Sequence, residues 1–200
     1  MSVAERLFGV QYPLISQYVD ILASTGVEWG LIGPREVDRL WERHILNSVA
    51  LADLIPQGSR VVDVGSGAGL PGIPLAILRP DLEMTLLEPL LRRFRFLTHS
   101  VEDLGITHAV RVVRARAEQH RSSYDVVLAR AVAPLDRLIA WCDPLRSPTG
   151  VILALKGRSA EDEVRGVATL FHQRGLTASV LSVRASATSD PTTVVRIAHG

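Results

Sequence analysis

Three closely spaced glycines follow a short apolar segment in the first half of the chain. Residues 61–64 read Val-Val-Asp-Val, residues 65–69 read Gly-Ser-Gly-Ala-Gly, and Leu-Pro-Gly at 70–72 opens a helical pattern. Glycines let the chain turn sharply after a strand and let a ligand approach the backbone, at the edge where open α/β sheets bind ligands. The segment therefore predicts a cofactor loop at a sheet edge, the alternative being a tight turn without a ligand.

The chain after residue 56 alternates β-rich and helical segments, which is the pattern of a parallel α/β sheet. The last two β-rich runs, residues 177–183 and 192–198, are joined by small and turn-forming residues, which predicts an antiparallel hairpin. We therefore expect a Rossmann-like α/β fold with a mostly parallel seven-stranded sheet. The other strands are expected at residues 60–64, 83–88, 110–114, 124–129 and 150–155, with helices starting near residues 72, 90, 133 and 160.

Residues 1–55 are predicted to form a helical extension. Apolar side chains recur at helical spacing in residues 14–22 and again in residues 37–49, which predicts two amphipathic helices. With 200 residues, 47% of them hydrophobic and 22% charged, the chain fits one globular domain. The expected organisation is a single domain, 1–200, made of the extension and a Rossmann-like core at residues 56–200.

Composition also limits the location and the partners of the protein. No apolar run approaches the length of a membrane span, and the first six residues lack the features of a signal peptide, which predicts a cytoplasmic protein. The single cysteine, Cys142, leaves no internal disulfide partner and no cysteine-cluster metal site, and is expected to be a core thiol. Because the net charge is only +1, any contact with nucleic acid must come from a local basic patch.

The residues around the glycines favour one kind of cofactor. A dinucleotide fingerprint would have glycine where Leu70 stands, and the Asp63 carboxylate would repel a pyrophosphate but suits the ammonium group of S-adenosylmethionine. Gly65 and Gly67 would then bring the backbone close to this cofactor. Glu88, at the end of the second expected strand, can accept both hydroxyl hydrogens of a ribose, or can instead cap the following helix.

With these residues in view, the chain resembles the bacterial 16S ribosomal RNA guanine-N7 methyltransferase G family, also called glucose-inhibited division protein B. The resemblance runs from about Val10 to the C-terminus and is most specific at residues 63–75. Asn47 departs from the family pattern, where aspartate is expected, and Glu88 stands where aspartate is commoner. Further matches lie at residues 43–48, 92–97, 130–133 and 154–157.

This resemblance implies a class I methyltransferase fold and S-adenosylmethionine as cofactor. It further implies that Gly65 and Leu70 line the cofactor pocket, that Ala117 and Glu118 border the adenine, and that Arg130 contacts the cofactor or the target. The implied reaction is methyl transfer to N7 of guanine 527 in 16S ribosomal RNA, within the small subunit or an assembly intermediate. Asn47 is expected to serve only as a cap or a hydrogen-bonding residue.

Methylation of guanine N7 needs no strong general base, because N7 carries a free lone pair. Alignment of well-oriented groups can supply about 7–11 kcal/mol of the acceleration. The candidate catalytic residues are Arg130, which the resemblance places in contact with the cofactor or the target at the end of the fourth strand, and Lys156, the only lysine, at the end of the fifth. Lys156 could reach a phosphate or guanine O6, or could be a plain surface lysine.

Arginines on the helix after Glu88 are the candidate RNA-binding residues. Arg92, Arg95 and His99 share a predicted exposed stripe, Arg93 is also a candidate, and a solvated face without RNA is the alternative. The predicted buried stripe holds Leu90, Phe94, Leu97, Val101 and Leu104. In the extension, His44 is expected to be a hydrogen-bonded edge residue rather than a catalyst.

Three other functions stay open at the level of the sequence. A class I methyltransferase acting on a small molecule would share every cofactor feature and would need a hydrophobic cap over the pocket. A non-catalytic binding module would hold adenosylmethionine without turnover. A nicotinamide-dependent oxidoreductase would bind a dinucleotide instead.

Overall fold

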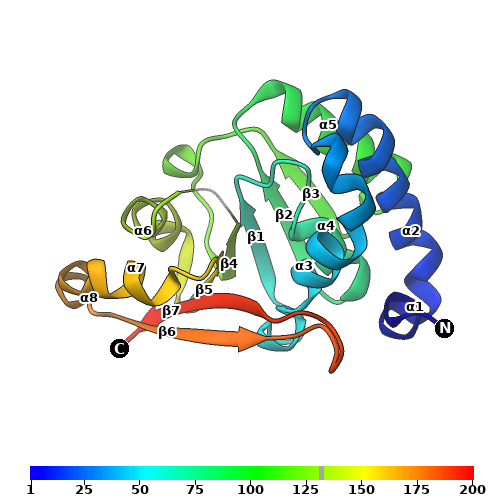
Figure 1. Cartoon of the computed structure of the whole chain (residues 1–200). Helices are drawn as coiled ribbons and strands as arrows, with labels where there is room; N and C mark the ends of the chain where they lie inside the picture. Colours follow the sequence, from blue (N-terminus) through cyan, green and yellow to red (C-terminus); the bar gives the residue numbers. More distant parts are fainter. Residues whose placement is uncertain (131–132) are drawn as a thin grey trace.

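The sheet predicted by the sequence is present, with strand order β3-β2-β1-β4-β5-β7-β6. The computed structural model (Figure 1) describes residues 1–130 and 133–200. Strands β1 to β5 run parallel to one another, and β7 runs antiparallel to both β5 and β6, so the C-terminal hairpin is confirmed. The strands are β1 (Arg60–Val64), β2 (Glu83–Leu87), β3 (Val110–Val113), β4 (Tyr124–Arg130), β5 (Arg146–Lys156), β6 (Leu176–Val183) and β7 (Thr192–His199).

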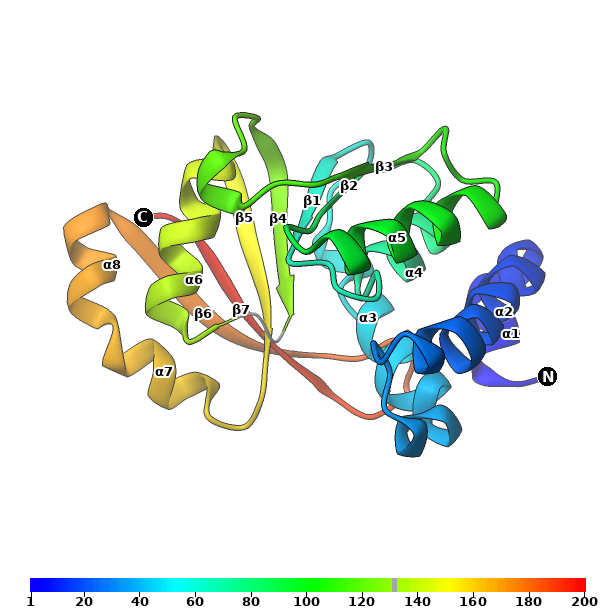
Figure 2. The ribbon, with the colours of Figure 1, turned by 90° about the horizontal axis from the view of Figure 1, so that it is seen from above.

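Both faces of the sheet are covered, which explains why its central strands read as continuous apolar runs. Because side chains alternate along a strand, Val61 of β1 joins one hydrophobic cluster while Val62 and Val64 join the other. The helices α4 (Gly72–Leu78) and α5 (Leu91–Asp103) lie on the first face, with the N-terminal helices. On the second face lie α6 (Leu135–Cys142), α7 (Ala160–Gly166) and α8 (Ala168–Arg174), as Figure 2 shows.

The boundary of β5 differs from the prediction and has a structural reason. The strand begins at Arg146, four residues before Gly150, and its pairing with β4 shifts register between Tyr124 and Val126. A Cβ atom at Gly150 would lie 2.8 Å from the backbone oxygens of Tyr124 and Asp125. The Ser-Pro-Thr-Gly segment that resembles a turn is therefore an irregularity within the strand.

The extension contains α1 (Val3–Phe8), α2 (Tyr12–Ile21) and α3 (Asn47–Val49), and the second of the two expected helices is not a regular one. Residues 34–39 form a tight 3₁₀ helix and residues 40–46 a wide π helix before α3. Within this stretch the Ser48 hydroxyl donates to the His44 carbonyl oxygen at 2.6 Å, a type of contact that bends helices. Wide helical turns are frequent at functional sites, and this one carries His44 toward the sheet edge.

The extension shares its core with the sheet. Leu40, Ile45 and Val49 are buried in the same cluster as the β1 and β2 side chains. Asn47 Nδ2 donates to Thr192 Oγ1 on β7 at 2.8 Å, so Asn47 has the hydrogen-bonding role that the sequence suggested. Arg79 Nη1 donates to the carbonyl oxygens of Ala52 and Ile55 at 2.9 and 3.1 Å. Within the described residues, no helix is long and apolar enough to cross a membrane.

We expect the extension and the sheet to unfold in one transition, because a shared hydrophobic core makes their burial cooperative. Thermal unfolding followed by far-ultraviolet circular dichroism should coincide with the transition seen by tryptophan fluorescence in a Trp141→Phe variant, in which Trp29 and Trp41 of the extension are the remaining tryptophans. Two separated transitions would show that residues 1–55 form an independent unit.

Candidate functional site

The loop after β1 is built on glycine for steric reasons. Gly65 N and Ser66 N both donate to the Leu87 carbonyl oxygen of β2, at 2.8 and 3.2 Å, which turns the chain across the sheet edge. Gly69 has a φ of +93°, and a Cβ atom there would lie 2.5 Å from Ile73 Cδ1. A side chain at this position would therefore clash in addition to being strained.

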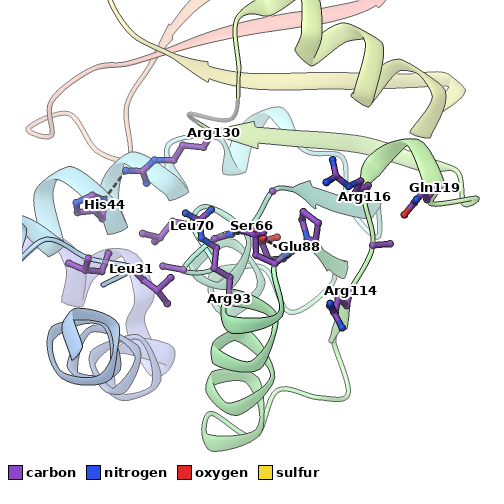
Figure 3. A pocket seen from close by; sticks show the side chains of 17 residues that line it. Leu31, His44, Ser66, Leu70, Glu88, Arg93, Arg114, Arg116, Gln119 and Arg130 are labelled. Atoms are coloured by element: carbon purple, nitrogen blue, oxygen red, sulfur yellow. Dashed lines mark hydrogen bonds between the residues drawn. The ribbon is translucent and has the colours of Figure 1, made fainter. Parts of the chain in front are cut away.

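A cavity of about 760 Å³ opens beside this loop, at the carboxyl edge of the sheet (Figure 3). Its wall combines the loop with segments that follow three other strands and with side chains of the extension. Contributions from the core are Gly65, Ser66, Gly67, Ala68 and Leu70, residues 88–90 and 114–116, Arg93, Gln119 and Arg130, and from the extension Leu31, Ile32 and His44.

A smaller cavity of about 170 Å³ adjoins the first and shares Gly65, Pro89 and residues 115–116 with it. Ala117 and Glu118 line this second cavity, with Trp141 of α6. The structure therefore brings together Gly65, Gly67, Leu70, Glu88, Ala117, Glu118 and Arg130, as one cofactor site requires; their contact with a cofactor stays a prediction.

Glu88 is 1% exposed and holds the loop to the following helix. Its Oε2 accepts a hydrogen bond from Gly67 N at 3.0 Å, and its Oε1 accepts one from Leu90 N at 2.9 Å. Leu90 is the residue before α5 (Leu91–Asp103), and no described side chain caps the first N–H groups of that helix, so Glu88 braces the loop without capping α5. Each carboxylate oxygen keeps a second lone pair, so the ribose contact stays a prediction compatible with these bonds.

Asp63 requires a correction, because its carboxylate lies under the loop and does not line the pocket. The neighbouring valines point to the opposite face of the sheet, so Asp63 points toward α4, where Oδ2 accepts a hydrogen bond from Gly72 N at 3.1 Å. Oδ1 is buried without a hydrogen-bond partner among the described residues. Burial raises the pKa of Asp63 to about 7. Any effect of this carboxylate on a cofactor must therefore act through the loop and through its electric field.

Tyr18 of α2 also supports the loop, a role that the sequence did not reveal. Its hydroxyl donates to the Ala68 carbonyl oxygen at 2.6 Å, and the side chain is completely buried. Burial raises the pKa of Tyr18 well above its usual value, which keeps the hydroxyl a neutral donor. Its position in an apolar helical stripe is the same as that of any core aromatic residue, so the sequence carries no signal for this contact.

Arg130 is held at the pocket by side chains of the extension, as the dashed line in Figure 3 shows for His44. Its Nη2 donates to His44 Nδ1 at 2.8 Å and its Nη1 to Ser48 Oγ at 3.3 Å. His44 Nε2 in turn donates to Glu36 Oε2 at 3.0 Å. Because Nδ1 accepts, the ring is neutral, and burial together with the nearby Arg130 lowers the pKa of His44. His44 is thus hydrogen-bonded, as expected, and it also lines the pocket.

The pocket wall is strongly basic. Arg93, Arg114, Arg116 and Arg130 all line it, whereas Glu88 is its one lining carboxylate within residues 1–130 and 133–200. Guanidinium groups bind phosphate well, so the pocket suits an anionic substrate.

The predicted stripes on α5 are partly correct. Arg92, Arg95 and His99 are exposed as expected. Leu90, however, is 54% exposed and Phe96, placed on neither stripe, is 1% exposed. The reason is that α5 begins at Leu91 and the preceding Leu90 is extended, so Leu90 does not follow the helical period. Arg92 and Arg95 border a separate recess, while Arg93 faces the pocket.

Lys156 does not line the pocket, so its expected reach toward a substrate needs correction. Its Nζ donates to the Ala133 carbonyl oxygen at 2.8 Å and forms an ion pair with Glu163 at 2.7 Å. This pairing arises because α7 begins four residues after β5 ends and folds Glu163 back over the strand end. The catalytic and RNA-binding roles of Lys156 stay predictions that require this pair to open. Ala131 and Val132, quoted for the resemblance, lie outside the described residues.

Cys142 is a buried free thiol on α6, and burial raises its pKa to about 12. A thiol with so high a pKa forms little thiolate at neutral pH and is unreactive. It is the core residue that the sequence predicted.

Gly72→Ala is expected to lower the free energy of unfolding by about 1–3 kcal/mol, because overpacking of a core strains it. A Cβ atom at Gly72 would lie 2.4 Å from Leu86 Cδ2 and 2.9 Å from Asp63 Oδ2. Urea unfolding measures the change. In the control Gly166→Ala, on α7, the added methyl group meets nothing within 4 Å and should stabilise by about 0.5–1 kcal/mol. Equal urea midpoints for Gly72→Ala and the parent protein would refute the tight packing of Gly72 against Leu86 and Asp63 under the loop.

Comparison with protein families gives one match across most of the chain. The GidB family, described as rRNA small subunit methyltransferase G, matches residues 11–189. The ribosomal RNA small subunit methyltransferase G of Streptomyces avermitilis is 52% identical over 201 residues, covering 98% of this chain and 84% of the relative. The protein of the same description from Mycobacterium marinum is 55% identical over 169 residues, covering 82% and 73%.

Solved structures match the fold at low sequence identity. Precorrin-6y C5,15-methyltransferase from Geobacter metallireducens aligns with a TM-score of 0.58 at 18% identity, covering 86% of this chain and 92% of that one. Ribosomal protein L11 methylase from Lactobacillus delbrueckii aligns with a TM-score of 0.58 at 12% identity, covering 76% of each. These matches confirm the expected class I methyltransferase fold.

Proposed function

Because the chain belongs to the rRNA small subunit methyltransferase G family, we propose that it transfers the methyl group of S-adenosylmethionine to N7 of a guanine in 16S ribosomal RNA. The match over residues 11–189 carries this proposal. The finer parts of it are guanine 527 as the target and a small subunit or assembly intermediate as the substrate. Since small subunits are assembled in the bacterial cytoplasm, the proposal also places the enzyme there.

The residues present fit the cofactor. The glycine loop lets the ligand approach the backbone at Gly65 and Gly67, and the lone pairs left on Glu88 suit a ribose. Leu70 offers an apolar contact, and the smaller cavity bordered by Ala117 and Glu118 suits the adenine. When bound, the cofactor supplies an electrophilic methyl group next to the arginine-lined part of the pocket.

The protein contributes binding and orientation rather than proton transfer. Guanine presents N7 and O6 as neighbouring acceptors, and N7 loses no proton on methylation. Arg130 is held by His44 and Ser48, and its remaining N–H groups can donate to O6 or to a phosphate. The four arginines of the pocket wall would hold the RNA backbone and align N7 with the methyl group.

The charge of the pocket also bears on the alternative substrates. A small-molecule substrate would need a hydrophobic cap over the pocket, whereas the wall of this pocket carries four arginines beside Leu31 and Ile32 of the extension. A dinucleotide would place its pyrophosphate over a loop that carries Leu70 in place of a glycine, with a buried carboxylate beneath it. Both alternatives are therefore less compatible with the site than a polyanionic RNA.

The test is methyl incorporation followed by mapping of the modified atom. Small subunits and naked 16S RNA from cells lacking the gene are incubated with the protein and with labelled S-adenosylmethionine, and aniline cleavage after reduction maps N7-methylguanine. We expect one new cleavage site, at guanine 527, and no label when that guanine is replaced by adenine. Labelling at another atom, or tight cofactor binding without any labelling of either RNA substrate, would overturn the proposed function.

A further inference from the structure

A second recess lies beside the pocket, on the other side of the first turn of α5. It has a volume of about 520 Å³ and is lined by Trp29, Leu91, Arg92 and Arg95. Its floor is apolar, and two of its four lining residues are arginines. Leu91 is 40% exposed, which is unusual for a large hydrophobic side chain of this protein.

Trp29 packs against two other rings at this recess. Its ring packs at an angle against the buried Phe96, with ring centroids 6.2 Å apart, and edge-on against His99 at 6.4 Å. Trp29 is nevertheless only partly buried, so part of its ring lines the recess. An aromatic surface beside cationic groups is the usual platform for an unpaired base.

The recess and the pocket are built from the same two segments. On α5 and its N-terminal cap, Leu90 and Arg93 line the pocket, whereas Leu91, Arg92 and Arg95 line the recess. In the extension, Trp29 lines the recess, while residues 31–32, two positions later, line the pocket. The start of α5 is thus a ridge between two openings, and Arg93 on its pocket side is labelled in Figure 3.

The charges around the recess fit a polyanion. Arg92 and Arg95 form no ion pair within the part of the chain that the structure describes, unlike Arg43, Arg79 and Arg165, whose guanidinium groups face carboxylates. The nearby Glu102 carboxylate lies 3.8 Å from His99 Nδ1. Two unneutralised guanidinium groups above an apolar floor match a base together with its flanking phosphates.

We propose that this recess binds a nucleotide next to the target guanine on the same single strand of RNA, with its base stacked on Trp29 and its phosphates bound by Arg92 and Arg95. This proposal rests on the proposed function, because the strand bound in the recess is the RNA that carries the target guanine. It assigns the ridge at the start of α5 a role in holding the strand splayed, with one base in the pocket and its neighbour in the recess.

Two measurements test the recess separately from the reaction. The first is the affinity of the full chain for a fluorescent single-stranded RNA that carries one guanine between uridines. Trp29→Ala should weaken this binding by at least about tenfold, the loss of one stacked base, and Trp29→Phe should restore most of it. Replacing both Arg92 and Arg95 by alanine should reduce the slope of log affinity against log salt concentration by the amount expected for about two phosphate contacts.

The second measurement is the Michaelis constant for the RNA substrate. Trp29→Ala should raise this constant without changing the dissociation constant of S-adenosylmethionine.

The controls separate stacking from folding. Arg137→Ala removes an exposed arginine on α6, far along the chain from the recess, and should leave both measurements unchanged. Because Trp29 also packs on Phe96, Leu91→Ala provides a variant at an exposed position, with an expected loss of a few-fold. RNA affinity in Trp29→Ala and Leu91→Ala equal to that of Arg137→Ala would overturn the proposed recess while leaving the methylation untouched. Binding that depends on Trp29 in a protein that methylates no RNA would support the recess and contradict the proposed function.

Discussion

Arg130→Ala is expected to lower the kcat for RNA methylation by about 100-fold or more, while the dissociation constant of S-adenosylmethionine changes only a few-fold. Loss of one preorganised donor at a reacting centre typically costs a factor of about 10²–10³. The guanidinium group is at the pocket wall and is fixed on one side by His44 Nδ1, 2.8 Å away, and by Ser48 Oγ. Single-turnover methylation of RNA measures the rate of the chemical step directly.

Because Arg130 is positioned by a hydrogen bond to His44, the expected loss of kcat depends on the geometry of the guanidinium group and not only on its charge. His44 must be neutral to accept from Arg130, and its lowered pKa maintains this state to pH values below the usual range of histidine. Arg130→Lys keeps the charge but cannot reproduce the fork of donors, so it should recover only a small part of the rate. The matched control is Arg137→Ala on α6. An Arg130→Ala enzyme with the parent kcat would exclude Arg130 from the reaction.

Asp63→Asn is expected to stabilise the cofactor-free protein above pH 7 and to weaken S-adenosylmethionine binding by roughly tenfold, the equivalent of about one pKa unit. Burial raises the pKa of Asp63 from 3.8 to about 7, so the folded protein favours the protonated carboxyl group. The stability that this group contributes is present below pH 3.8 and is lost as the pH rises to about 7. Because asparagine is neutral, like the protonated carboxyl group, Asp63→Asn removes this pH-dependent loss of stability.

Cofactor binding should show the opposite dependence. The ammonium and sulfonium groups of S-adenosylmethionine favour the ionised carboxylate under the loop, so the affinity of the parent protein should increase as the pH rises from 6 toward about 7.5, through the pKa of about 7. Calorimetric titrations and urea unfolding across this range measure both effects. Asp136→Asn, at an exposed position in the first turn of α6, is the control and should leave the pH dependence of both quantities unchanged. If the cofactor affinity and the free energy of unfolding of Asp63→Asn varied with pH in the same way as those of the parent protein, Asp63 would not titrate in this range.

The sequence predicted the sheet well because its signals are local. All seven strands lie where alternation and apolar runs placed them, apart from a few boundary residues. The glycine loop was equally accessible, since its turn is determined by residues within one short segment. The errors arose where local and tertiary preferences differ, as in residues 34–46, whose apolar spacing is helical but whose backbone winds irregularly to carry His44 toward Arg130.

The sequence by itself therefore determined the α/β architecture, the place of the cofactor loop and some of the charged residues at the carboxyl edge of the sheet, but not Arg114 and Arg116 of the pocket wall. Tertiary structure decided what each charge does. It buried Asp63 beneath the loop, paired Lys156 with Glu163, and connected Arg130 to His44, 86 positions away along the chain. The physical reason is that backbone turns and strand periods depend on neighbouring residues, whereas burial and ion pairing depend on contacts between segments that are distant in sequence.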